Sequence, residues 1–154
     1  MAACVVGIGQ EWAGDDGVGI AVIRRLRQDG AALDLVEASE PTQLISLLTG
    51  GADPVVVVDA ILDDDGPPGR VLLVEMNRAG GFCERLLSTH GVGVMEAIEL
   101  ARIAHPGGIA KSILVVGVTI GRPSRSGGGL SPEVEAAAPR AAAQAIKLAC
   151  GDTA

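Results

Sequence analysis

The stretch PVVVVDAIL, residues 54–62, decides the fold of this chain, because its β-branched side chains show no alternation with polar ones. A short apolar run of this kind predicts a strand covered on both faces, as in a parallel sheet that lies between two layers of helices. Asp59 directly follows the four valines. A carboxylate at the end of such a run is partly buried and needs a hydrogen-bond donor or a cation.

Four other apolar runs alternate with helical patterns on either side of this strand. They predict strands at residues 3–9, 33–38, 70–76 and 112–120. Apolar stripes at helical spacing predict helices after Gly17, after Thr42 as N-cap, over residues 91–104, and after Ser131 as N-cap. The internal Pro139 predicts a kink or a late start in the last helix. The fold class is therefore α/β: a single-domain α/β/α sandwich around a mostly parallel, twisted five-stranded sheet.

Composition limits the possible classes of protein. The 154 residues suggest one domain spanning residues 1–154, and the formal net charge of −7 with scattered basic residues argues against a nucleic-acid surface. The start of the chain lacks the basic region and apolar segment of a signal peptide, and no window approaches ~18 uninterrupted apolar residues. We therefore expect a cytoplasmic protein without membrane contact. Three widely spaced cysteines fit neither a disulfide framework nor a zinc site.

The loop GIGQEWAGDDGVGI, residues 7–20, carries two adjacent acids among glycines. It is not a dinucleotide fingerprint, since Trp12 stands where the third glycine belongs. Asp15 and Asp16 cannot both cap the helix that follows, so we assign the cap to Asp15 and leave Asp16 as a candidate ligand. The surrounding glycines would let a bulky partner approach the backbone closely.

Three residues are candidates for chemistry because ligands collect at the carboxyl ends of strands in open α/β sheets. They are Asp16, Asp59 and His90, which lies in the STHG segment. Each has a simpler reading: a helix cap, a satisfied polar residue at a strand end, and a loop histidine bonded to backbone. Together, two carboxylates and an imidazole form a ligand set for a borderline divalent metal, with positions open for water or substrate. The chain shows neither a P-loop nor a GxSxG nucleophile motif.

Four blocks in this order resemble the [NiFe]-hydrogenase maturation endopeptidases: VVGIGQEWAGDDGVGIAVIRRL, VVVVDAILDDDGPPGRV, STHGVGVMEAIELA and VVGVTIG with GGLSPEVEAA. The resemblance covers about residues 4–148. It implies an α/β/α sandwich that removes a C-terminal peptide from a hydrogenase large-subunit precursor after nickel insertion. It places the metal-binding and catalytic roles on Asp16, Asp59 and His90. The resemblance also implies that the nickel is delivered by the precursor, and we expect a monomer.

Some positions depart from the family pattern. The first ligand is often Glu in the family, and Asp16 is one methylene shorter; Gln10 stands where Asn is usual. The segment ASEPTQLI, residues 38–45, is similar to members that process cytosolic, NAD-linked or bidirectional hydrogenases. These departures leave a second hypothesis open, namely a non-catalytic assembly factor that binds the metal or the precursor.

Overall fold

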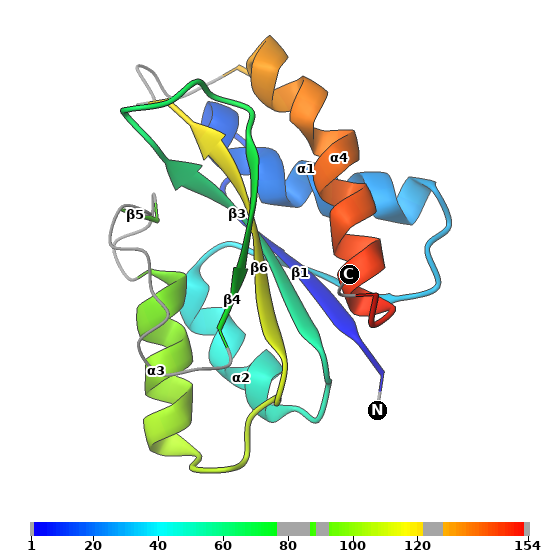
Figure 1. Ribbon diagram of the computed structural model, residues 1–154, viewed down its shortest axis with the longest axis vertical. Helices are drawn as coiled ribbons and strands as arrows, with labels where there is room; N and C mark the ends of the chain where they lie inside the picture. The colour runs from blue at the N-terminus through cyan, green and yellow to red at the C-terminus, as the bar shows by residue number, and fades with distance from the viewer. Residues whose placement is uncertain (1, 77–86, 89–92, 122–127, 153–154) are drawn as a thin grey trace.

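The computed structural model describes residues 2–76, 87–88, 93–121 and 128–152, and its centre is a twisted sheet (Figure 1). The strands are β1 (Cys4–Ile8), β2 (Asp34–Ala38), β3 (Val55–Leu62), β4 (Val71–Glu75), β5 (Leu87–Ser88) and β6 (Ile113–Ile120). The order across the sheet is β2-β1-β3-β6-β4, and the two-residue β5 pairs with β3. β1, β2, β3 and β6 are parallel, whereas β4 and β5 are antiparallel to their partners. The five predicted strands and the mostly parallel sheet are confirmed.

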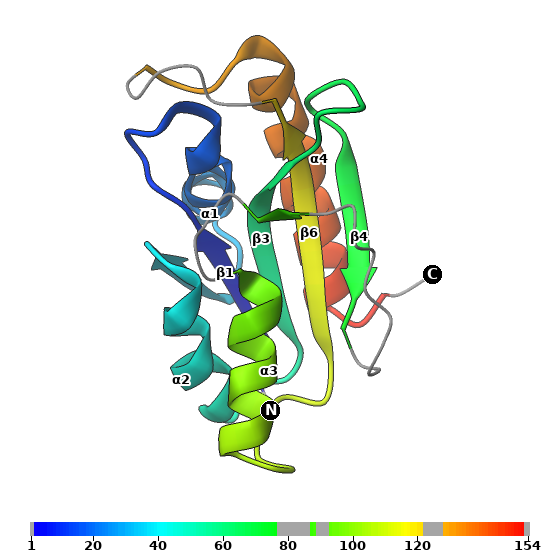
Figure 2. The same cartoon turned by 90° about the vertical axis from the view of Figure 1, so that its left-hand side faces the viewer.

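Helices cover both faces of this sheet (Figures 1 and 2). α1 (Val18–Gln28) and α4 (Pro132–Ala149) pack on one face, and α2 (Leu44–Thr49) and α3 (Val94–Ala104) pack on the other. Two short 3₁₀ helices, η1 (Gly14–Gly17) and η2 (Pro41–Gln43), lead into α1 and α2. The predicted α/β/α sandwich is thus observed. No helix among the described residues has the length and apolar character that a bilayer crossing requires.

The central strand shows why the valine run decides the fold. Val56 and Val58 belong to the core cluster under α1 and α4, whereas Val55 and Val57 belong to the cluster under α2 and α3. Successive side chains of a strand point to opposite faces, so a strand between two helical layers needs apolar residues at every position. All four valines are fully buried. The exception in this pattern is the carboxylate at Asp59.

Two predictions about helix starts are wrong. Thr42 is not an N-cap: it lies inside η2, where Glu40 is the N-cap and forms a capping box with Gln43. Of the kink or late start predicted for the last helix, the late start is wrong, since α4 begins at Pro132 and runs through Pro139; the kink stays a prediction. Pro139 is exposed, and so is Glu135, the residue four positions earlier whose backbone carbonyl loses its helical partner.

Candidate functional site

Asp59 lies inside β3 rather than at its end. It is the fifth of eight residues and stands opposite Gly117 of β6. The preceding residue, Val58, pairs with Gly7 near the end of β1, so Asp59 is level with the carboxyl end of β1. β3 therefore continues past its neighbour, and the acid lies where the sheet narrows. Strand alternation puts its side chain on the face covered by α2 and α3.

The Asp59 side chain is 2% exposed, and its Oδ1 accepts a hydrogen bond of 2.9 Å from the backbone N–H of Ala60. A buried carboxylate costs free energy unless donors or cations compensate it. A carboxylate that is kept among buried valines despite this cost is therefore a candidate for a functional residue.

Asp16 lies in η1, directly after the loop that leaves β1, and is 7% exposed. Its Oδ2 accepts a hydrogen bond of 3.1 Å from the backbone N–H of Gln10. A Cβ on Gly9 would collide with the backbone carbonyl oxygen of Asp16, so η1 lies tightly against the end of β1. η1 also contacts β3. The structure thus brings Asp16 and Asp59 to the same end of the sheet from two separate segments.

Asp15 does not cap the first helix, so that prediction is wrong. The N-cap residues of η1 and α1 are Ala13 and Gly17, and neither helix has a side-chain cap. Asp15 instead accepts two hydrogen bonds from Ser131, from its backbone N–H at 2.6 Å and from its hydroxyl at 2.8 Å. Ser131 is the N-cap residue of α4, as predicted, but its side chain makes no cap bond to its own helix. A partner 116 residues away gives no signal in the local sequence.

His90 lies outside the described residues. Ser88 in β5 pairs with Ile61 of β3, two residues beyond Asp59, and only Thr89 separates Ser88 from His90 in the sequence. Among the described residues, no group of three or more His, Cys, Asp or Glu side chains is arranged to hold a metal. Because His90 is the third member of the predicted ligand set, that set stays a prediction.

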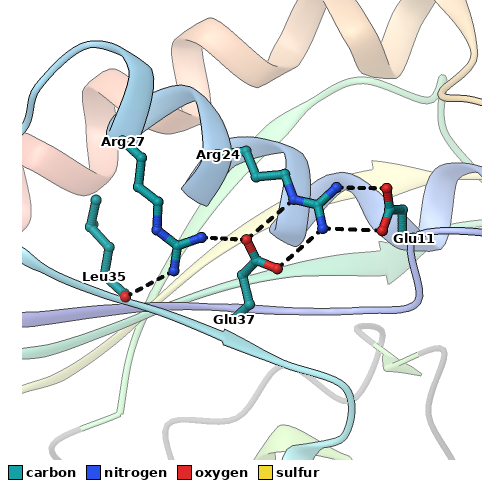
Figure 3. A network of polar contacts seen from close by, with 5 residues as sticks. All are labelled: Glu11, Arg24, Arg27, Leu35 and Glu37. Carbon is teal, nitrogen blue, oxygen red and sulfur yellow. Dashed lines mark hydrogen bonds and ion pairs between the residues drawn. The ribbon is translucent and has the colours of Figure 1, made fainter.

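An ion-pair network holds the loop that precedes η1 (Figure 3). Arg24 of α1 donates to Glu11 on this loop at 2.6 Å and to Glu37 of β2 at 3.2 Å. Arg27 also donates to Glu37 and to the carbonyl of Leu35. Hydrogen bonds from Arg24 hold the pKa of both glutamates below the usual range. The network thus connects the loop, α1 and the edge strand, and local sequence reasoning did not identify it.

The glycines around the two acids have mainly internal reasons. A Cβ on Gly19 would lie 2.5 Å from the carbonyl oxygens of Ile8 and Val58, so this glycine lets α1 approach the sheet. Gly14 alone of the glycines in this loop has open space around it, and its φ of +60° suits a glycine turn. A groove of about 360 Å³ begins beside Gly14 and Gly17 and runs along α1 past Arg24. The predicted close approach of a partner to the glycine backbone is therefore possible at Gly14, which has open space around it. It does not explain Gly19, whose surroundings are filled by the protein's own backbone.

Buried polar side chains are rare in the described part of the chain: they are Asp16, Asp59 and Thr119. Thr119 has a structural explanation, since its hydroxyl accepts from the N–H of Arg70 and donates to the carbonyl of Pro67. The two buried acids share one end of the sheet. Two carboxylates placed in this way can bind a cation or accept a proton from water.

Residues 20–148 match the family model for hydrogenase maturation protease. The chain belongs to this family. The matched range contains Asp59 and His90, and it begins four residues after Asp16. The class of protein predicted from the four sequence blocks is confirmed, and with it the assignment as a protease, a hydrolase.

Two curated relatives and one solved structure are similar to this chain over most of its length. Protein FrxA of Pyrococcus furiosus is 32% identical over 136 residues, which cover 83% of this chain and 90% of that protein. Hydrogenase 2 maturation protease of Escherichia coli is 27% identical over 139 residues, which cover 88% and 83%. The solved [NiFe] hydrogenase maturation protease HybD from Thermococcus kodakarensis superposes with a TM-score of 0.78 at 24% identity, covering 97% of this chain and 99% of that one. At that identity the superposition shows a shared fold.

Proposed function

We propose that this chain is the endopeptidase that removes the C-terminal extension from the large-subunit precursor of a [NiFe]-hydrogenase after nickel insertion. Family membership supports protease activity, and the Escherichia coli relative is named for the maturation of hydrogenase 2. The structural observation that carries the proposal is the pair of buried carboxylates, Asp16 and Asp59, at one end of the sheet.

In this proposal the nickel ion belongs to the substrate and arrives with the precursor. Asp16, Asp59 and His90 complete its coordination, and the scissile bond is thereby held next to the two carboxylates. Carboxylate and imidazole donors suit a borderline divalent ion. Binding of the loaded precursor in this way fixes the scissile bond relative to the two carboxylates. Such a fixed geometry supplies much of the rate advantage of the reaction.

Hydrolysis requires a water molecule whose oxygen attacks the scissile carbonyl carbon. One of the two carboxylates accepts the proton of that water, the C–N bond breaks, and the leaving amine takes up a proton. The products are a new C-terminal carboxylate on the large subunit and a free peptide. This route needs no acyl-enzyme, in keeping with a sequence that has no GxSxG motif.

The direct test mixes the protein with nickel-loaded and nickel-free precursor and follows the loss of mass from the large subunit. We expect cleavage of the loaded form only. Equal processing of both forms would contradict recognition of nickel. Stable binding of the loaded precursor without cleavage would support the alternative, a non-catalytic assembly factor.

The site assignment has its own test. Asp16→Asn, Asp59→Asn and His90→Ala should each lower the cleavage rate by about 10²-fold or more, as expected for groups that handle protons or the metal. Asp65→Asn is the matched control, because Asp65 is an exposed acid in the turn after β3. Full activity in any of the three site variants would remove that residue from the site.

A further inference from the structure

A two-point hydrogen bond joins η1 to the start of the distant helix α4. The carboxylate of Asp15 accepts from the backbone N–H of Ser131 at 2.6 Å and from its hydroxyl at 2.8 Å. Both side chains are half-buried. Such paired, charge-assisted bonds fix orientation as well as distance.

The helix end that Asp15 contacts is itself held by other parts of the chain. A Cβ on Gly69 would lie 2.5 Å from the carbonyl oxygen of Glu133, so the first turn of α4 packs closely on the loop before β4. Arg140 of α4 donates to the carbonyl of Gly69 at 2.7 Å. The N-terminal part of α4 is therefore held in place by the loop before β4, and Asp15 connects η1 to it through hydrogen bonds.

The two neighbouring acids of η1 form hydrogen bonds to two different parts of the chain. Asp15 binds Ser131, whereas Asp16 accepts from the N–H of Gln10 on the loop after β1. The bonds of Asp15 to Ser131 and of Asp16 to Gln10 thus hold η1 between the start of α4 and the end of β1. The hydroxyl of Ser131 donates to Asp15 instead of capping its own helix, which is the usual role of a serine at this position.

We infer that Asp15 is a positioning residue, which holds η1 so that the Asp16 carboxylate stays in place for the reaction. Asp15 does not touch the substrate in this account. The inference rests on the proposed function, since it assigns Asp15 a role at the same site. Its removal should slow the chemical step and leave precursor binding nearly unchanged.

The variants separate hydrogen bonding from charge. Asp15→Ala removes both bonds to Ser131. Asp15→Asn keeps them, because the amide oxygen accepts from the N–H and the hydroxyl turns to accept from the amide nitrogen. Asp53→Ala is the control for general destabilisation. Asp53 is also half-buried and also accepts from two distant backbone N–H groups, those of Lys111 and Ser112, but it lies at the opposite end of β3.

Steady-state cleavage of nickel-loaded precursor at varied concentration, measured well below the melting temperature of each variant, gives the first readout. We expect kcat to fall about 10- to 100-fold in Asp15→Ala with KM changed by less than about twofold, because small misplacements are costly in catalysis. Asp15→Asn should restore kcat to within about threefold of the unchanged protein. Unchanged kcat in Asp15→Ala, or an equal loss in Asp53→Ala, would overturn the inference.

Hydrogen exchange of the free protein gives a second readout that is independent of cleavage. Asp15→Ala should speed exchange of the backbone amides of Gln10 and Asp16, and Asp53→Ala should not. If the unchanged protein does not cleave precursor, the proposed function fails. In that case the exchange data still decide whether Asp15 fixes η1: equal protection in Asp15→Ala and the unchanged protein would refute it.

Discussion

Gly19→Ala is the substitution for which the structure gives the clearest magnitude. Alanine favours a helix over glycine by about 0.5–1 kcal/mol, so helix propensity alone predicts stabilisation. However, the new Cβ would lie 2.5 Å from two backbone carbonyl oxygens, those of Ile8 and Val58, and ordinary contacts begin at 3.4 Å. The helix must therefore retreat by about 0.9 Å, and no side-chain rotation can relieve the overlap.

Overpacking of this kind costs about 1–3 kcal/mol, and backbone partners favour the upper end. After the gain in helix propensity is subtracted, we expect a net loss near 2 kcal/mol in the free energy of unfolding, or about 4–8 °C in Tm for a chain of this length. Thermal and urea unfolding followed by circular dichroism measure this loss. Gly108→Ala is the control, since its Cβ would make only ordinary contacts at 3.5 Å. A Gly19→Ala protein as stable as the unchanged one would refute the close approach of α1 to the sheet.

Three further predictions concern Cys4 and Arg24. Burial raises the pKa of the Cys4 thiol to about 11, so in a Cys83→Ser background a thiol reagent near pH 8 should label the exposed Cys150 and leave Cys4 unlabelled until the protein is denatured. Because the folded-state pKa of Cys4 is raised, the neutral thiol contributes its full stability below pH 9.0, and this contribution is lost as the pH rises towards about 11. The free energy of unfolding of the unchanged protein should therefore decline over this pH range, and Cys4→Ala should remove the part of the decline that the thiol causes. An equal decline in Cys4→Ala would contradict the raised pKa of Cys4. Arg24 holds the pKa of Glu37 below its usual range, so this pairing stabilises the protein above pH 4.5 and is lost as the pH falls through the lowered pKa. Since the Arg24 side chain is 45% exposed, its ion pairs are screened by solvent and contribute little to stability. Arg24→Ala should therefore lower Tm by no more than about 3 °C in low salt and by less in high salt. A larger loss would contradict the interpretation of this network as a set of solvent-exposed ion pairs.

The sequence predicted the five main strands and both helical layers because each depends on local periodicity. The valines of residues 55–58 require cover on both faces, and that requirement alone leads to helices on either side of the sheet. The position of β4 could not be predicted in this way. Its direction and its place beside β6 depend on pairing between segments far apart in the chain.

Two of the candidate site residues could be selected from the sequence for a similar reason, and their roles stay predictions. Asp16 and Asp59 could be selected because a carboxylate next to an apolar run is locally conspicuous, and both are buried at one end of the sheet. The bond between Asp15 and Ser131 could not be predicted in this way. An acid at the start of a helix is typical of an N-cap, and Ser131 is distant in sequence. Whether His90 joins the two acids stays a prediction, since it lies outside the described residues.

The strand order has a consequence for how the protein is made. β6 fills the place between β3 and β4, although both of those strands leave the ribosome before it (Figure 2). Until residues 113–120 are synthesised, one edge of the valine-rich β3 lacks the neighbour that later covers it. Such late, non-local pairing slows folding and leaves an apolar edge open to other chains. A nascent chain shorter than about 120 residues should therefore be a target for chaperones, and Asp59 cannot gain its neighbour Gly117 before β6 is in place.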